Sequence, residues 1–251
     1  MAKPLPLKLG IEPLVEATCE LRVKPSIPLH TVLPGYLFTK LIPADLGKLE
    51  QLAPAGIPAS VRAQEPTLAS AHLMRLEWKG HYVHFGETGI AITSMTPYPG
   101  WDFFKVDVAN LFGTVLTSGF VQTVERYSTK YVNLFDGQGG IRPHAAFDLS
   151  LGIGSFKLTD EICQLRVEVH GGEFLNILTI ASSAVVVQPG LGQRAGAIVD
   201  VDSICQLQSA DVETFKSELV SRLDALKIHN KTAFFDILTH ETIEALMPTY
   251  E

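Results

Sequence analysis

The chain has 251 residues, of which 46% are hydrophobic, and its 20 Lys and Arg against 27 Asp and Glu give a formal net charge of −7. This length suffices for one large domain or two small ones, and the apolar content excludes a disordered chain. The negative balance argues against direct nucleic-acid binding and against binding to anionic membranes, because both need dense positive charge.

The chain carries a surplus of apolar side chains. Only 19% of its residues are charged, and the mean hydropathy is +0.20. No apolar run is long enough to cross a bilayer, because the richest stretch, 177–187, is interrupted by Thr179, Ser182 and Ser183. The surplus therefore belongs either to a large core or to an interface with another protein chain.

The cysteines and the N-terminus indicate a cytoplasmic protein. Cys19, Cys163 and Cys205 are odd in number, widely spaced and without a C-x-x-C pair, which is typical of a reducing compartment. All three fall in strand-like runs, so we do not expect a nucleophile among them. Residues 1–10 lack the continuous apolar segment of a signal peptide.

The first half of the chain predicts an extended arm followed by strands and a helix. Period-2 alternation favours strands, and apolar residues recurring at three- and four-residue steps favour a helix. Lys79-Gly80 and 86–89 have turn composition. The predicted elements are an arm over 1–12, a short helix over 33–41 with Pro34 in its first turn, strands over 14–23, 68–78, 81–85, 90–95 and 120–135, and a helix over 101–116.

The second half repeats the order of strands before helices. Strands are predicted over 158–169, 174–187 and 197–206, with a hairpin turn at Gly171-Gly172. A long helix follows over Val212–Leu226, with Ser209 as its N-cap. Two short helices are predicted over 231–238 and 240–247, with Thr239 capping the second.

These patterns predict an α+β fold of two antiparallel-sheet halves, each with strands followed by a packing helix, and a helical C-terminus. The glycine cluster at 136–140 is the best candidate boundary. It gives an N-terminal half over 1–136 and a C-terminal half over 137–251, with one continuous domain as the alternative.

Several familiar site motifs are incomplete. The glycines of 190–196 precede a predicted strand, whereas a phosphate loop needs a helix N-terminus. His81 and His84 point to opposite faces of their strand, and although His72 could approach one of them, a zinc ligand set cannot be assembled. No G-x-S-x-G elbow is present. We therefore expect no cofactor, no metal and no catalytic nucleophile.

Carboxylates gather on two predicted strands. Asp200 and Asp202 share one strand face roughly 7 Å apart, a spacing that suits Mg²⁺ or acid–base chemistry as well as an ordinary solvated face. Glu16 and Glu20 lie with Arg22 on the polar face of the first strand. We expect that second group to neutralise itself.

The central strand supplies three more candidates, and the last helical region a fourth. Arg126 and Tyr127 point to opposite faces, while Tyr127 and Asn133 share one. A buried Arg126 needs a carboxylate such as Glu16, Glu20 or Asp200, or else it binds an anionic ligand. His229 is expected to begin the turn after the long helix and to cap its C-terminus as a cation.

Short segments follow one another in a characteristic order over about residues 9 to 247: 13–16, 20–22, 101–103, 125–133, 199–202, 226–229, Phe235 and Thr239. In this order they resemble a sporadically distributed bacterial family of unknown function. Its members more often carry Arg-Tyr directly before an Ile/Val-Asn, a place that either Arg126-Tyr127 or Lys130-Tyr131 could fill here. The resemblance implies a cytoplasmic α+β protein without an assigned reaction, acting with a partner in a multi-gene, defence-linked system.

The leading expectation is a non-catalytic protein-binding module, an accessory or neutralising subunit of a bacterial complex. Its partner would be another protein chain, in a homo- or hetero-oligomer. One alternative is a small-ligand-binding protein or enzyme with an apolar cavity between the sheet and the long helix. The other is a metal-dependent enzyme that uses Asp200 and Asp202.

Overall fold

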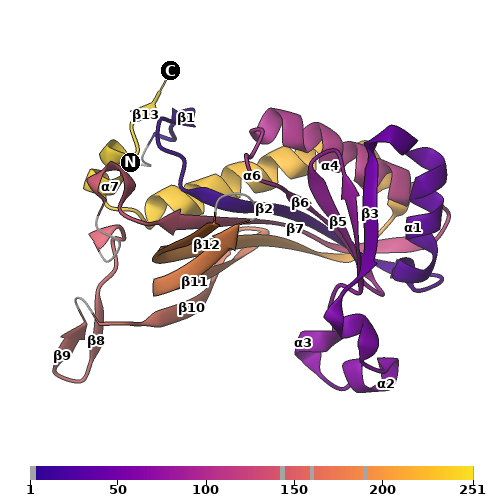
Figure 1. Cartoon of the computed structure of the whole chain (residues 1–251), viewed down its shortest axis with the longest axis horizontal. Helices are drawn as coiled ribbons and strands as arrows, with labels where there is room; N and C mark the ends of the chain where they lie inside the picture. The colour runs from indigo at the N-terminus through magenta and orange to yellow at the C-terminus, as the bar shows by residue number, and fades with distance from the viewer. Residues whose placement is uncertain (1–3, 142–144, 159–160, 189–191, 251) are drawn as a thin grey trace. The chain divides into compact units, whose positions relative to one another are not determined.

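The structure of the protein is a computed structural model, and it describes residues 4–141, 145–158, 161–188 and 192–250 (Figure 1). The chain forms two compact units. The first comprises Met1–Ala17, Lys130–Ser203 and Leu226–Glu251, and the second comprises Thr18–Thr129 and Ile204–Ala225. The predicted boundary at 136–140 lies inside the first unit.

Helices and antiparallel strands are both abundant, which confirms the predicted α+β class. The strands are β1 (Lys8–Leu9), β2 (Leu14–Pro25), β3 (Leu46–Gln51), β4 (Met74–Trp78), β5 (His81–Phe85), β6 (Gly89–Ser94), β7 (Val121–Phe135), β8 (Leu151–Ile153), β9 (Phe156–Leu158), β10 (Gln164–Gly171), β11 (Phe174–Gln188), β12 (Gly192–Ala210) and β13 (Pro248–Thr249). The α-helices are α1 (Leu29–Lys40), α2 (Ala59–Arg62), α3 (Pro66–Ala69), α4 (Trp101–Leu116), α5 (Val212–Ser217), α6 (Leu219–Asp236) and α7 (His240–Ala245). None of the described helices is long and apolar enough to cross a membrane.

The second unit is built on a sheet in the order β12-β7-β2-β6-β5-β4-β3. β4, β5 and β6 form antiparallel hairpins, and Trp78 pairs with His81 across the predicted turn. Both turn residues, Lys79 and Gly80, have positive φ, at 48° and 75°. This is the conformation of a two-residue hairpin turn, so the predicted turn is confirmed.

Alternation along β2 decides which face of this sheet is buried. Cys19, Leu21 and Val23 are buried, as their period-2 spacing predicts, and the residues between them are only partly covered. α4 packs on the side of His81, whose ring lies 5.3 Å from that of Phe104. The polar even positions of β2 therefore lie on the other side of the sheet.

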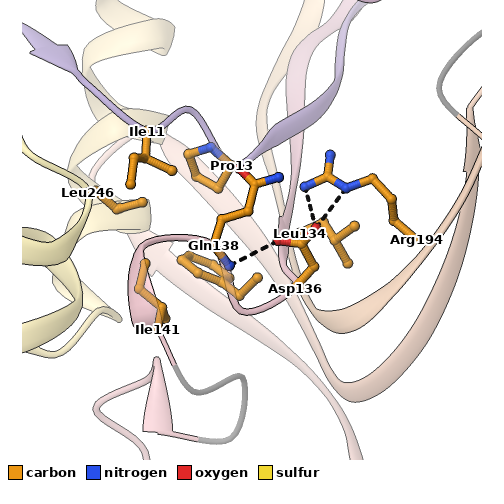
Figure 2. Close-up of a pocket in the computed structure, with 9 residues that line it drawn as sticks. Ile11, Pro13, Leu134, Asp136, Gln138, Ile141, Arg194 and Leu246 are labelled. Atoms are coloured by element: carbon orange, nitrogen blue, oxygen red, sulfur yellow. Dashed lines mark hydrogen bonds and ion pairs between the residues drawn. The ribbon is translucent and has the colours of Figure 1, made fainter.

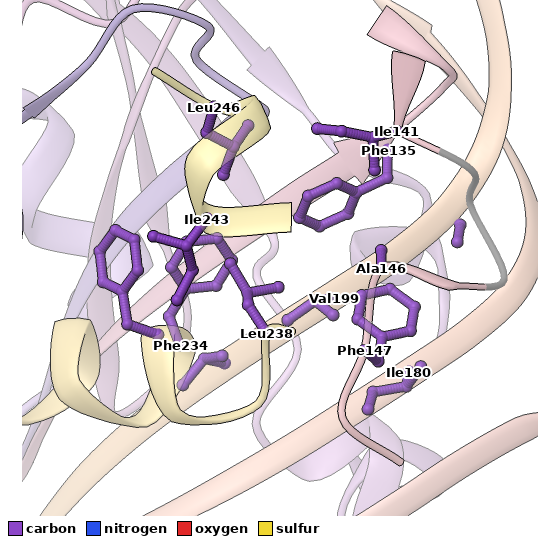
Figure 3. Packing of buried hydrophobic residues seen from close by; sticks show 13 residues of the cluster. Phe135, Ile141, Ala146, Phe147, Ile180, Val199, Phe234, Leu238, Ile243 and Leu246 are labelled. Carbon is purple, nitrogen blue, oxygen red and sulfur yellow. The ribbon is translucent and has the colours of Figure 1, made fainter. Parts of the chain in front are cut away.

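The first unit contains a sheet in the order β10-β11-β12-β7-β2. β10 and β11 form an antiparallel hairpin, and two small sheets, β1 with β13 and β8 with β9, accompany it. Its core lies between β12 and the last helices (Figure 3), where Val199 packs with Phe234, Leu238 and Ile243. Gly196 is required beside this core, because a Cβ there would lie 2.2 Å from the Phe135 carbonyl oxygen.

Several predicted boundaries in the earlier part of the chain are wrong. α1 begins at Leu29, so Pro34 lies inside the helix and not in its first turn. β3 was not predicted, because as an exposed edge strand it has no apolar alternation. The strand predicted over 158–169 is divided between β9 and β10, with 159–160 outside the described residues.

The predicted long helix starts at Val212, as predicted, but its predicted N-cap and its predicted end are wrong. Ser209 has a φ of 53° and does not cap it; the Asp211 side chain accepts a hydrogen bond from the Thr214 N–H at 2.9 Å instead. The helix is interrupted at Glu218, and α6 then continues to Asp236 through the predicted turn. Thr239 caps α7, as predicted.

Candidate functional site

The Glu20 cluster, formed by Glu20, Arg22 and Arg126, lies on the polar face of the sheet in the second unit. Glu20 Oε1 accepts a hydrogen bond from Arg22 Nε at 2.9 Å, and Oε2 accepts one from Arg126 Nη2 at 3.1 Å. This confirms the predicted internal ion pair and selects Glu20 among the three proposed carboxylates. One carboxylate thus forms ion pairs with two guanidinium groups at a partly buried position.

Two histidines adjoin this cluster. His72 Nε2 lies 3.9 Å from Glu20 Oε1, and the rings of His72 and His84 are 5.1 Å apart. Burial, with smaller contributions from the neighbouring His72 and Arg75, lowers the pKa of His84 to about 3, so His84 is neutral at physiological pH. His81 faces the other side, where its Nε2 lies 3.1 Å from Asp107, so the predicted opposite orientation of His81 and His84 is confirmed.

Tyr127 lies on the helix-covered side of β7. It is buried, and its ring meets that of Phe215 edge to face at 5.4 Å. Burial raises the pKa of Tyr127 far above its usual range, with a smaller contribution from Cys205, so its hydroxyl stays protonated. Asn133, at a later odd position of the same strand, is also buried.

The Lys130 cluster, formed by Glu16, Lys130, Asp200 and Asp202, lies in the first unit. Lys130 Nζ is 3.2 Å from Glu16 Oε1. Burial alone would lower the pKa of Lys130, but Glu16, Asp200 and Asp202 together raise it above its ordinary value. This arrangement is the reverse of the Glu20 cluster, because here three carboxylates interact electrostatically with one cation.

Asp200 and Asp202, which were considered as metal ligands, both interact electrostatically with the Lys130 ammonium group. Burial raises the pKa of Asp200. Lys130 lowers this pKa and so offsets part of the rise, whereas Glu16 raises it further. The part of the chain that is described contains no group of three His, Cys, Asp or Glu residues able to hold a metal ion. The electrostatic interaction of Lys130 with both aspartates favours internal neutralisation.

A buried network of polar side chains in the first unit reaches His229 through Asn176. Asn230 Nδ2 donates to the Val201 carbonyl at 2.8 Å and to Ser203 Oγ at 3.0 Å, and Ser203 Oγ donates to Asn176 Oδ1 at 2.6 Å. Asn176 Nδ2 lies 2.9 Å from His229 Nε2. An amide nitrogen can only donate, so His229 accepts at Nε2 and carries its proton on Nδ1.

His229 was predicted to end a helix as a cation, and that prediction is wrong. It lies inside α6 and is neutral in this network. The sequence did contain a signal for Asn230, which was not predicted: the buried stripe Leu219, Leu223 and Leu226 continues with the same spacing to this residue. An amide in such a stripe needs buried hydrogen-bond partners.

The neutral state of His229 predicts a pH dependence. Burial lowers its pKa, more than Glu173 raises it, so folding favours the unprotonated ring. The stability it contributes is complete above the unfolded pKa of about 6.5 and is lost as the pH falls below that value toward the folded pKa. We expect His229→Gln to show a shallower loss of unfolding free energy between about pH 6.5 and 5. Urea unfolding of both proteins across this range measures it, and equal slopes would contradict it.

A small pocket lies in the first unit beside the Asp136–Arg194 ion pair (Figure 2), whose Nη2 and Oδ2 atoms are 2.8 Å apart. Ile11, Pro13 and Leu246 are among its apolar lining residues. Its volume of about 220 Å³ includes space open to solvent. The volume that compares with ligand cavities is about 10 Å³, roughly the space for one water molecule and far below the roughly 300–1,000 Å³ of typical ligand sites.

The structure places six of the nine predicted site residues in two clusters. Glu20, Arg22 and Arg126 form one cluster, and Glu16, Asp200 and Asp202 form another with Lys130. Tyr127, Asn133 and His229 belong to neither cluster. Comparison with protein-family models and with curated proteins gave no match.

Proposed function

We propose that this chain is a non-catalytic protein-binding module, an accessory or neutralising subunit of a bacterial cytoplasmic complex. The resemblance to a patchily distributed bacterial family supports a defence-linked setting. The proposal rests mainly on one observation in the second unit, the exposed apolar side of α4.

α4 is apolar on two sides. Phe104, Val108 and Leu111 are buried, whereas Phe103 is 73% exposed and Val106, one turn further on, is 64% exposed. Leaving such side chains in water forgoes roughly 1.5–3 kcal/mol each. An aromatic and a β-branched residue on one exposed helix face are suitable anchors for a protein interface.

The charge around this face favours a partner of particular chemistry. Asp102 is exposed beside Phe103. The whole chain has a net charge of −7. The expected partner is therefore a different protein chain with an apolar docking surface and a positively charged rim.

The test uses the tagged chain expressed together with the products of its neighbouring genes. We expect one of these products to copurify in fixed stoichiometry, and we expect Phe103→Asp with Val106→Asp to reduce its recovery roughly tenfold or more. Ile228→Asp, at an exposed apolar position of α6, is the matched control and should retain the partner. Recovery of no neighbouring product, or undiminished recovery with the double variant, would refute the proposal.

A further inference from the structure

β10 is an edge strand with few of the features that usually protect sheet edges. It ends the sheet order, and no described strand pairs with its outer side. Its register with β11 is continuous from Gln164 to Gly171, without a bulge or a proline, and most of its side chains are exposed. The edge strand β3 of the second unit differs, because its ladder is interrupted between Leu46 and Leu49.

The hairpin turn fixes which peptide groups of β10 point outward. The two-residue loop 172–173 is closed by the pair Gly171 and Phe174. Such a closing pair is hydrogen-bonded, and hydrogen-bonded pairs alternate along an antiparallel ladder. The odd-numbered residues of β10 therefore direct their peptide groups toward β11. The even-numbered residues from Gln164 to His170 direct theirs toward the free edge.

The side chains of β10 separate into two faces. Leu165, Val167 and Val169 share one face and are opposite Ile180, Leu178 and Asn176 of β11. Ile180 and Leu178 belong to the core of the first unit or pack against it. Arg166 and Glu168 lie on the other face, with Arg166 Nη1 and Glu168 Oε1 3.0 Å apart.

We propose that the free edge of β10 pairs antiparallel with the same edge of a second copy of this chain, with the twofold axis at Val167. In this register Arg166 of each copy is opposite Glu168 of the other, and Leu165 is opposite Val169. The outward-directed peptide groups then meet one another, as an antiparallel ladder requires. Registers centred on Arg166 or Glu168 would put like charges opposite each other at the axis, which destabilises a strand pair.

This dimer goes beyond the proposed function, because it involves the first unit and a copy of the same chain, whereas the proposed partner site is on α4. It would extend the apolar face formed by Leu165, Val167 and Val169 across the axis, and would cover valines that are exposed in a single copy. It would also satisfy the edge peptide groups. Each ion pair within a strand would gain two oppositely charged neighbours.

Charge-swap variants of the full chain test the register. We expect sedimentation equilibrium to show a dimer for the native chain, and a dissociation constant raised roughly tenfold or more by either Arg166→Glu or Glu168→Arg. An equimolar mixture of these two variants should form a heterodimer, and the double variant should dimerise like the native chain, because both restore opposite charges across the axis. Circular dichroism checks that each variant is folded.

A cysteine pair tests the axis directly. Val167→Cys should form a disulfide-linked dimer on oxidation, because its two copies would face each other across the axis. Glu168→Cys is the matched control and should not, since its copies would lie two positions apart in the ladder; the native chain controls for Cys163. A monomeric native chain, a dimer unaffected by both charge variants, or equal cross-linking at 167 and 168 would each overturn the proposal. None of these outcomes bears on partner binding through α4.

Discussion

Replacing Asn230 by alanine is expected to lower the free energy of unfolding by about 2–4 kcal/mol. The substitution removes the donors to the Val201 carbonyl and to Ser203 Oγ, both in a part of the first unit from which solvent is excluded. Those acceptors lose their partner and cannot turn to water, and the smaller side chain leaves unfilled space. Urea unfolding measures the change.

The control for this prediction is Asn110→Ala, at an exposed position of α4, which we expect to change stability by less than about 0.5 kcal/mol. Ser203→Ala combined with Asn230→Ala should cost less than the sum of the single changes, because the serine hydroxyl is then no longer left unsatisfied. Strictly additive losses, or a loss no larger than that of Asn110→Ala, would show that the network contributes little.

Replacing Glu20 by glutamine is expected to destabilise the protein by about 2–4 kcal/mol. The carboxylate, which is 13% exposed, is the anion shared by Arg22 and Arg126. Without its charge, two guanidinium groups remain close together with their mutual repulsion uncompensated. The loss should be smaller at high salt, because salt screens that repulsion.

Glu16→Gln is the matched control on the same strand. Glu16 is 41% exposed, and Asp200 and Asp202 continue to compensate Lys130 after its charge is removed. We expect a change of less than about 1 kcal/mol. Adding Arg126→Gln to Glu20→Gln should recover part of the lost stability. The interpretation fails if Glu20→Gln costs no more than Glu16→Gln.

Local sequence patterns were sufficient where one chain segment determines its own structure. The helix over 101–116 and the Lys79-Gly80 hairpin were predicted because apolar spacing and turn residues act over a few positions. The polar face of β2 was predicted in the same way. The need of a buried Arg126 for a carboxylate partner was predicted as well, and Arg126 pairs with Glu20. The carboxylate that pairs with Arg126 could be narrowed only to Glu16, Glu20 or Asp200, because the order of strands in a sheet is not encoded in any one strand.

The sequence by itself determined the α+β class, the alternation that buries one face of β2, and the chemical need to compensate Arg126. The tertiary structure decided that Glu20 meets two arginines while Lys130 meets three carboxylates, and that His229 accepts from Asn176 within a continuous helix. The physical reason is the separation along the chain over which each effect acts. Hydrophobic periodicity acts between residues a few positions apart, whereas Arg126, His229 and Asn230 each contact a polar side chain more than 25 residues away.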